Sequence, residues 1–254
     1  MIDSILEFNR QFVADRAYEP YITDKFPAKK LAVLTCMDTR LTELLPKALG
    51  LRNGDAKIIK NAGGLVLSET DSAIRSLLVG IYELGVQEVM VVHHSTCGAC
   101  HMSYEEFKPH MLERGVSEET LEAWEANGVA DWLEGFHDTE ASVRKTVMAV
   151  VSHPLVPVGV TVRGFIIDSV TGELTEVDCP DAERIARIKE MEFRLDRLSQ
   201  NPENKEDYEY LSNYLDSEQW RQDFEADEAG LLPEGLKRGV LSEDGLYNLL
   251  DSIA

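Results

Sequence analysis

Cysteine and histidine side chains directly follow two short apolar runs of this 254-residue sequence. Cys36 comes after residues 31–35, and His94 and Cys97 come after residues 86–92. The carboxyl ends of parallel strands meet at one edge of a sheet, where ligands bind in doubly wound folds. If the two runs are neighbouring strands, two thiolates and one imidazole converge there, a donor set that suits zinc. Three protein ligands leave the fourth position open, as in catalytic sites, so we expect one zinc ion (Zn2+) per chain.

Two further segments are expected at the same edge. Asp38 and Arg40 lie two residues apart, so both can lie beside the metal. Either they form a local ion pair, or Asp38 acts as an acceptor next to the metal and Arg40 keeps it ionised and oriented. The segment Asn61-Ala62-Gly63-Gly64 follows a third apolar run, and its glycines permit either a simple turn or a close approach of the backbone to a ligand.

The elements that must position these residues alternate along the first part of the chain. Short apolar runs indicate strands, and amphipathic stretches between them indicate helices, two of which Ser68 and Asp138 are expected to cap. The alternation predicts an α/β fold with a mainly parallel β-sheet flanked by helices. The expected strands span residues 31–35, 57–60, 86–92, 158–168 and 174–177, and the expected helices span residues 42–49, 68–84 and 138–152.

The sequence changes character after Cys179 and Pro180. The remainder is acidic and shows no convincing strand, so we expect a zinc domain at residues 1–178 and a small all-helical domain at residues 179–254. The first helix of that second domain carries an apolar stripe that must pack either on its own domain or on the zinc domain. The expected helices span residues 181–199, 203–216, 218–228 and 243–251, and the stripe comprises Ile185, Ile188, Met191, Leu195 and Leu198.

The composition excludes several classes of protein. The 25 Lys and Arg residues against 46 Asp and Glu residues give a formal net charge of −21, which argues against nucleic acid or an anionic membrane as a partner. The longest apolar runs fall far short of the roughly 20 residues that span a bilayer. The chain starts without the pattern of a signal peptide, and four cysteines are too few for a disulfide scaffold. We therefore expect a cytoplasmic protein.

Taken together, these motifs resemble the β-class carbonic anhydrases, over residues 25–178. The resemblance implies that Cys36, His94 and Cys97 bind zinc with an Asp38–Arg40 dyad beside the metal, and that the chain forms a homodimer or a higher homo-oligomer. Thr96 departs from the family pattern, because many members carry Asp there. The resemblance rests on Cys36-x-Asp38-x-Arg40, Asn61-Ala62-Gly63-Gly64 and His94-x-x-Cys97-Gly98, and extends to Val162-Arg163-Gly164, Asp168 and Thr171-Gly172.

The activity that this resemblance implies is the reversible hydration of CO2 to bicarbonate and a proton by a zinc-bound hydroxide. Asp38 would aim the hydroxide, although in some members the aspartate replaces the zinc-bound water in a closed state, and the backbone of residues 61–64 would line the substrate pocket. Two thiolates and a neutral imidazole cancel the formal charge of Zn2+, so activity should favour alkaline pH. His93, His101 and His110 are candidates for the proton shuttle.

Several alternatives stay open. Cys97 and Cys100 form a C-x-x-C pair that suggests dithiol redox chemistry, although this would leave Cys36 and His94 without a role. The same zinc site could hydrolyse carbonyl sulfide or carbon disulfide, or belong to a catalytically silent zinc-binding interaction protein. Cys100 is expected to be dispensable for zinc but to form a disulfide with Cys97 once zinc is removed. The C-terminal segment resembles a small bacterial helical domain family of unknown function.

Overall fold

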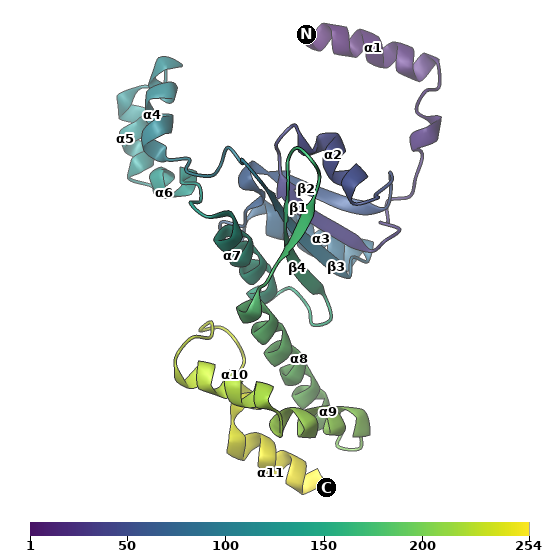
Figure 1. Cartoon of the computed structure of the whole chain (residues 1–254), viewed down its shortest axis with the longest axis vertical. Coiled ribbons are helices and arrows are strands. Elements are labelled where there is room, and N and C mark those ends of the chain that lie inside the picture. Colours follow the sequence, from purple (N-terminus) through teal and green to yellow (C-terminus); the bar gives the residue numbers. More distant parts are fainter. Residues whose placement is uncertain (254) are drawn as a thin grey trace.

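The computed structural model describes residues 1–253, the side chain of Glu243 excepted. Its centre is a five-stranded sheet in the order β2-β1-β3-β4-β5 (Figure 1). The first four strands run parallel, and β5 returns antiparallel to β4. This mainly parallel sheet confirms the α/β fold predicted from the sequence. The strands are β1 (Leu31–Cys36), β2 (Ala56–Asn61), β3 (Glu88–His94), β4 (Thr161–Ile167) and β5 (Leu174–Val177).

Helices cover both faces of the sheet, because its central strands carry apolar side chains on both sides. Every residue of β1 is buried. α2 (Leu41–Ala48) packs on the face that presents Leu31 and Val33. α3 (Ser72–Leu84) packs on the opposite face against Ala32 and Leu34, and α7 (Thr139–Ser152) lies on that face as well.

Two element boundaries differ from the expected ones for local reasons. α3 begins after Asp71 rather than Ser68, because the Asp71 side chain accepts a hydrogen bond from Ala73 N and caps the helix. Residues 158–160 form a turn before β4, where Gly159 adopts a φ of 88°. Asp138 caps α7 as expected, by accepting a hydrogen bond from Ala141 N at 2.6 Å.

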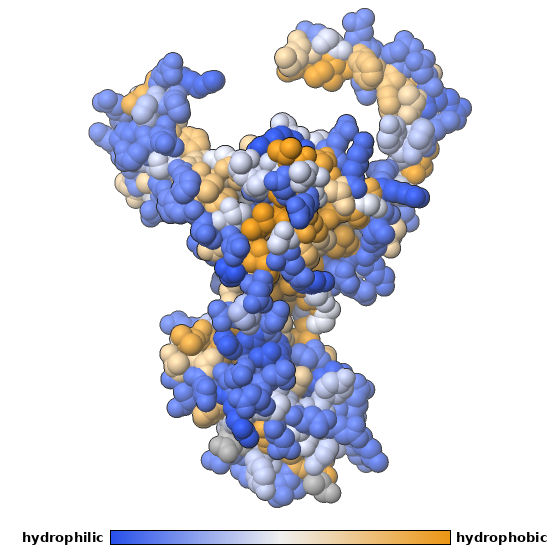
Figure 2. Space-filling view, viewed as in Figure 1, coloured by the Kyte–Doolittle hydropathy of each residue, from blue (hydrophilic) through white to orange (hydrophobic). Residues whose placement is uncertain are grey.

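Two helical segments that the sequence did not predict project from the body (Figure 1). α1 (Ile2–Ala14) buries none of its side chains within the described structure, and Figure 2 shows apolar surface along this projection. The second projection lies between β3 and α7 and consists of α4 (Tyr104–Glu113), α5 (Glu118–Glu125) and α6 (Val129–Leu133). None of the helices in residues 1–253 combines the length and the hydropathy that a membrane span requires.

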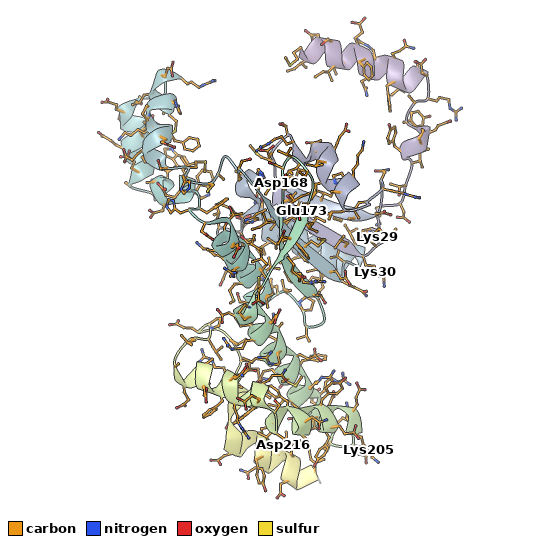
Figure 3. The ribbon with its side chains drawn as sticks, viewed as in Figure 1. Lys29, Lys30, Asp168, Glu173, Lys205 and Asp216 are labelled. Carbon is orange, nitrogen blue, oxygen red and sulfur yellow. The ribbon has the colours of Figure 1, made fainter. Side chains whose placement is uncertain are left out.

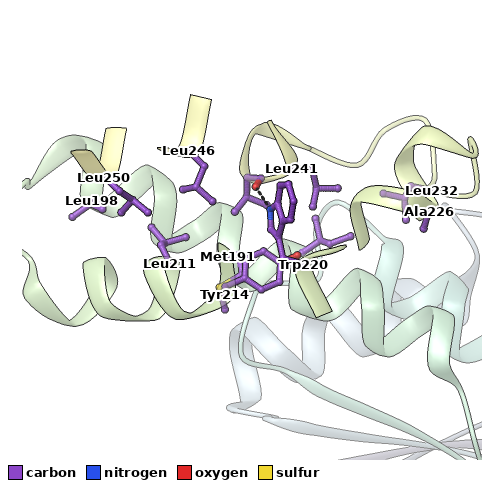
Figure 4. Close-up of a cluster of buried hydrophobic side chains, with 12 residues drawn as sticks. Met191, Leu198, Leu211, Tyr214, Trp220, Ala226, Leu232, Leu241, Leu246 and Leu250 are labelled. Carbon is purple, nitrogen blue, oxygen red and sulfur yellow. Dashed lines mark hydrogen bonds between the residues drawn. The ribbon is translucent and has the colours of Figure 1, made fainter. Parts of the chain in front are cut away.

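The C-terminal helices enclose a core of their own (Figure 4). Trp220 lies in this core, and its Nε1 donates a hydrogen bond to Val240 O at 3.0 Å. These helices confirm the expected all-helical C-terminal segment. They are α8 (Pro180–Gln200), α9 (Lys205–Leu215), α10 (Glu218–Glu228) and α11 (Glu243–Ile253), with a short 3-10 turn at Gly239–Leu241.

α8 contributes to both hydrophobic cores. Near its start, Ile185 lies in a buried cluster with Val143 and Val147 of α7. Further along, Ile188 and Leu198 lie in the core of the C-terminal helices. The two packing alternatives for the apolar stripe are therefore both realised, at different positions of one helix.

A lysine side chain reinforces this junction between α8 and the sheet domain. Lys189 Nζ donates hydrogen bonds to the carbonyl oxygens of Val151, His153 and Val156, at 2.9, 3.3 and 2.9 Å. These carbonyls lie at the end of α7 and just beyond it, where backbone acceptors are left without helical partners. The ammonium group therefore joins α8 to the chain segment that leads into β4.

Candidate metal centre

The cluster of possible metal ligands is built from the ends of two neighbouring strands. Cys36 is the last residue of β1 and His94 is the last residue of β3, and these strands pair in parallel. Cys97 lies in the turn that follows β3. One ligand atom from each of the three residues lies within 4.8 Å of the others, and all three residues are buried. The Sγ atoms of Cys36 and Cys97 are 3.8 Å apart.

The orientation of His94 leaves one ring nitrogen free to bind a metal. Its Nδ1 is 2.9 Å from Ser95 O, which fixes the ring when this nitrogen carries the proton. Its Nε2 is buried and has no hydrogen-bond partner among residues 1–253. A buried nitrogen lone pair without a partner is costly, and a metal ion beside two thiols would satisfy it. The donor set therefore fits zinc.

The two thiols influence each other's ionisation, because a charge on one sulfur disfavours a second charge nearby. The hydrogen bond with Cys97 lowers the pKa of Cys36, against the opposing effect of burial. The hydrogen bond with Cys36 raises the pKa of Cys97, and burial adds to this. The pair therefore retains a proton that a bound divalent cation would displace.

Asp38 and Arg40 form a bidentate pair beside this cluster. Arg40 Nε donates to Asp38 Oδ1 at 3.0 Å, and Arg40 Nη2 donates to Asp38 Oδ2 at 2.8 Å. The hydrogen bond with Arg40 is the main reason that the pKa of Asp38 falls to about 2. Asp38 Oδ2 is 3.9 Å from the free Nε2 of His94. The carboxylate is thus ionised, held by Arg40 and adjacent to the candidate metal position.

The segment Asn61-Ala62-Gly63-Gly64 forms a tight turn against the end of β1. The Asn61 side chain closes this turn through Leu65, accepting from its N at 2.9 Å and donating to its O at 2.7 Å. Gly64 has a φ of 73°, and a Cβ there would lie 3.1 Å from Cys36 N. The glycines therefore form a turn. The close approach that they permit is between this turn and the backbone of β1, the strand that carries Cys36.

Comparison with known proteins identifies the family. A family profile described as "Carbonic anhydrase" matches residues 31–174. The crystal structure of β-carbonic anhydrase isoform I from Trichomonas vaginalis aligns with a TM-score of 0.64 and 32% identity, covering 70% of this chain and 97% of that one. The chain belongs to the β-carbonic anhydrase family.

Two curated relatives of this chain differ in their named activities. The protein named "Putative carbonic anhydrase YvdA" from Bacillus subtilis is 48% identical over 178 residues, which are 69% of this chain and 90% of that protein. A carbon disulfide hydrolase from Acidithiobacillus thiooxidans is 30% identical over 156 residues, 58% of this chain and 76% of that protein. A second family profile, described as "Domain of unknown function (DUF4298)", matches residues 182–253. The expected fusion of a carbonic anhydrase to a small helical domain is therefore confirmed.

The outer side of Arg40 is held by residues that the sequence did not single out for this role. Arg40 Nη1 donates to Thr96 Oγ1 at 2.9 Å and to Ser169 Oγ at 3.2 Å, and Nη2 donates to Thr96 O at 3.0 Å. Ser169 lies directly after Asp168, on the β4–β5 hairpin marked in Figure 3. Asp168 and Thr171-Gly172 in the sequence indicated this hairpin, but nothing in the sequence indicated that Ser169 contacts Arg40.

Asp168 shapes the hairpin rather than approaching the cluster. Its Oδ1 accepts hydrogen bonds from Val170 N and Thr171 N at 2.9 and 2.7 Å, and these bonds lower the pKa of Asp168 to about 2. Its Oδ2 accepts a hydrogen bond from Ser95 Oγ at 3.1 Å, and Ser95 Oγ in turn accepts from Ser169 N at 2.9 Å. The hairpin thereby fixes Ser169 against Arg40.

The three histidines considered as proton shuttles lie in different environments. His93 is fully buried, its Nε2 lies 3.2 Å from Gly64 O, and burial lowers its pKa to about 4. His110 is exposed on α4. His101 is exposed and lies against a further histidine, His137, with their Nδ1 atoms 3.3 Å apart. His93 therefore serves packing, and only the other two face solvent.

Cys100 lies apart from the thiol pair of the cluster. Its Sγ contacts His137 O at 3.9 Å, whereas Cys97 Sγ contacts Cys36 Sγ. All four cysteines, which include Cys179 near the start of α8, are free thiols in the described structure. The thiol contact that Cys97 makes is therefore with Cys36, while its C-x-x-C partner Cys100 contacts a backbone oxygen.

Proposed function

We propose that this protein hydrates CO2 reversibly to bicarbonate and a proton, using one zinc ion per chain held by Cys36, His94 and Cys97. The observation that carries the proposal is the position of the ionised Asp38 carboxylate, 3.9 Å from the free Nε2 of His94 in the buried Cys–His–Cys cluster. A structural zinc site would need a fourth protein ligand in the same place. In this chain, the group beside the three ligands is the Asp38 carboxylate, which Arg40 holds by two hydrogen bonds.

A zinc ion in this cluster would lower the pKa of a water molecule and so provide hydroxide near neutral pH. The two thiolates and the neutral imidazole balance the charge of the ion, so we expect activity to rise toward alkaline pH. His94 Nδ1 faces Ser95 O, which keeps the imidazole in the tautomer that leaves Nε2 free to coordinate.

Asp38 would orient the nucleophilic oxygen. Because its pKa is about 2, it is an ionised acceptor at every pH at which the protein would work. It can therefore take a hydrogen bond from hydroxide and direct the oxygen lone pair at the carbon of CO2. Arg40 engages both carboxylate oxygens, so Asp38 is retained in the dyad, and this supports an open site over one closed by the aspartate.

Stopped-flow CO2 hydration by the zinc-loaded chain tests this proposal. Asp38→Asn should lower kcat/KM on the order of 100-fold, because the nucleophile loses its charged acceptor. The matched control is Glu176→Gln, which removes a bidentate arginine pair of similar geometry, with Arg163, on the exposed part of the sheet. Unchanged rates in Asp38→Asn would reduce the dyad to a structural ion pair.

Carbon disulfide is the second candidate substrate, because carbon disulfide hydrolases are among the relatives. The same protein should be incubated with carbon disulfide and with carbonyl sulfide, and the release of hydrogen sulfide should be measured. Hydrolysis of either molecule without measurable CO2 hydration would replace the first proposal with this one. Zinc binding without turnover of any of the three would favour the silent interaction protein.

We further propose that the chain forms a homodimer in which α1 packs on the second copy. An isolated helix of 13 residues is marginal in water, and α1 buries none of its side chains in the described chain. Ile5, Leu6 and Phe8 are 61%, 53% and 73% exposed. Large apolar side chains exposed together on one helix are typical of an interface.

Light scattering tests this proposal, with an expected mass of twice the 28.5 kDa of one chain. Leu6→Glu with Phe8→Glu should shift the protein toward monomer, because two buried charges would oppose the contact. Arg10→Glu, also on α1, is the control. A monomer in the unmodified protein would contradict the proposal.

We also propose that the protein is cytoplasmic. The four cysteines of the described structure are free thiols, which is typical of proteins in a reducing compartment.

A further inference from the structure

A pair of histidines, His101 and His137, lies outside the candidate zinc centre, and neither is among the proposed zinc ligands. The Nδ1 atoms of His101 and His137 are 3.3 Å apart, and the ring centroids are 5.6 Å apart. Both residues are exposed, whereas Cys36, His94 and Cys97 are buried. We propose that His101 and His137 form a second binding site, for a divalent transition-metal ion that prefers imidazole ligands.

The backbone holds the two histidines side by side. Cys100 and Phe136, the residues that precede them, form a parallel β-bridge. His101 N donates to Phe136 O at 2.7 Å, and Phe136 N donates to Ala99 O at 3.1 Å. His101 and His137 each follow a bridged residue directly, and their imidazoles lie side by side.

Two backbone features show that this approach is closely constrained. A Cβ on Gly135 would lie 2.0 Å from Ala99 O, so only glycine allows the two segments to come this close. His101 has a φ of 65°, a left-handed conformation that is uncommon for residues other than glycine. Strained residues of this kind persist where the surroundings hold them, and they are frequent at ligand sites. The pair is therefore arranged before any ligand arrives.

The separation of the two nitrogens suits a shared metal ion. Zinc–nitrogen bonds of about 2.05 Å at a tetrahedral angle place two ligand nitrogens about 3.3 Å apart. Imidazole is a ligand that zinc, copper and nickel ions all accept. In the metal-free pair, one Nδ1–H can donate to the other nitrogen, and a metal ion would replace that single proton. Solvent would occupy the remaining positions of the ion.

Access from solvent is open. His137 and Asp138 line part of a cavity of about 670 Å3 that also borders α6 and α7. Phe136 packs against the ring of His93, with centroids 5.8 Å apart, which anchors the bridge to the sheet. The second site would thus bind and release its ion on a rigid base, without disturbing the buried thiols.

Calorimetric titration of nickel chloride into the zinc-loaded, tag-free protein tests the proposal, since the primary site is then already filled. We expect one further equivalent to bind, with affinity reduced at least about tenfold in both His101→Gln and His137→Gln. The matched control is His110→Gln. His110 is exposed on α4 and has no histidine partner in the described structure, so this variant should bind nickel as the unmodified protein does.

The inference would be overturned if the unmodified protein bound no further equivalent, if both variants kept their affinity, or if His110→Gln lost affinity equally. Zinc content and circular dichroism of every variant should match those of the unmodified protein, since both substituted side chains are exposed. Loss of the primary zinc in His101→Gln would also count against the proposal, because it would show that the two sites are not separate. Failure of the CO2 hydration assay would leave this test unaffected, because the titration measures how much nickel binds and how tightly, not enzymatic turnover.

Discussion

The division of α8 between two hydrophobic cores can be tested by one substitution at each position. Ile185 is 1% exposed and packs with Val143 and Val147 of α7. Leu198, on the same helix, is fully buried in the core of the C-terminal helices. Replacing either residue by alanine removes buried methyl and methylene groups worth about 0.8 kcal/mol each. With the cavity that remains, each substitution should cost about 2–5 kcal/mol.

The two cores can be followed by different signals. Trp220 is 7% exposed in the C-terminal core, while Trp124 and Trp132 are 60% and 64% exposed on the second projection. The change in tryptophan fluorescence on unfolding should therefore report mainly on the C-terminal core. Zinc release to a chromogenic chelator should report on the sheet domain that carries the ligands.

Urea titrations should then separate the two variants. With a slope of about 2 kcal/mol per molar urea, a loss of 2–5 kcal/mol lowers a midpoint by about 1–2.5 M. We expect Ile185→Ala to lower the midpoint of zinc release and Leu198→Ala to lower the midpoint of the Trp220 signal. If Ile185→Ala changed only the Trp220 signal, the start of α8 would not belong to the sheet domain. A domain boundary at residues 178/179, which the sequence predicts and the structure does not test, would then hold.

Two further predictions concern buried groups near the cluster. Burial lowers the pKa of His93 from 6.5 to about 4, so the unfolded chain binds a proton near pH 6.5 that the folded chain does not bind until about pH 4. The free energy of unfolding should therefore fall as pH falls through this window, by up to about 3 kcal/mol, and urea titrations of His93→Gln should lack this dependence. After zinc removal, hydrogen peroxide should oxidise Cys36 and Cys97 to a disulfide while it is reduced to water, because their sulfurs are 3.8 Å apart. Peptide mapping by mass spectrometry that found Cys97 joined to Cys100 instead would support the prediction made from the C-x-x-C spacing.

The sheet and the cluster could be predicted because their sequence signals are local. Strands buried on both faces require continuous apolar runs, and β1 and β3 show them clearly. The rule that ligands gather at the carboxyl ends of parallel strands then brings Cys36, His94 and Cys97 together without knowledge of any other contact. The pairing of β1 with β3 was the single assumption, and the structure contains it.

The projections could not be predicted in the same way. α4, α5 and α6 bury only Tyr104 and Leu121, so their sequences carry little of the periodic apolar pattern that indicates a helix. α4 also contains Pro109, which normally indicates the end of a helix. α1 buries no side chain within the described chain, although the ring of Phe12 lies 6.4 Å from that of Tyr21, between centroids. The apolar pattern is therefore weak in the second projection, whereas in α1 it is present but has no buried partner in the described chain.

The contacts on the outer side of Arg40 depend on tertiary structure. Thr96 has a φ of 54°, which no residue pattern in the sequence indicates, and Ser169 comes from a hairpin far along the chain. Both offer neutral acceptors to the guanidinium group. A carboxylate at position 96, as many members of the family carry, would compete with Asp38 for the same charge. Threonine instead leaves Asp38 as the carboxylate that Arg40 neutralises, which accords with the low pKa of Asp38 and with its position next to the free nitrogen of the cluster.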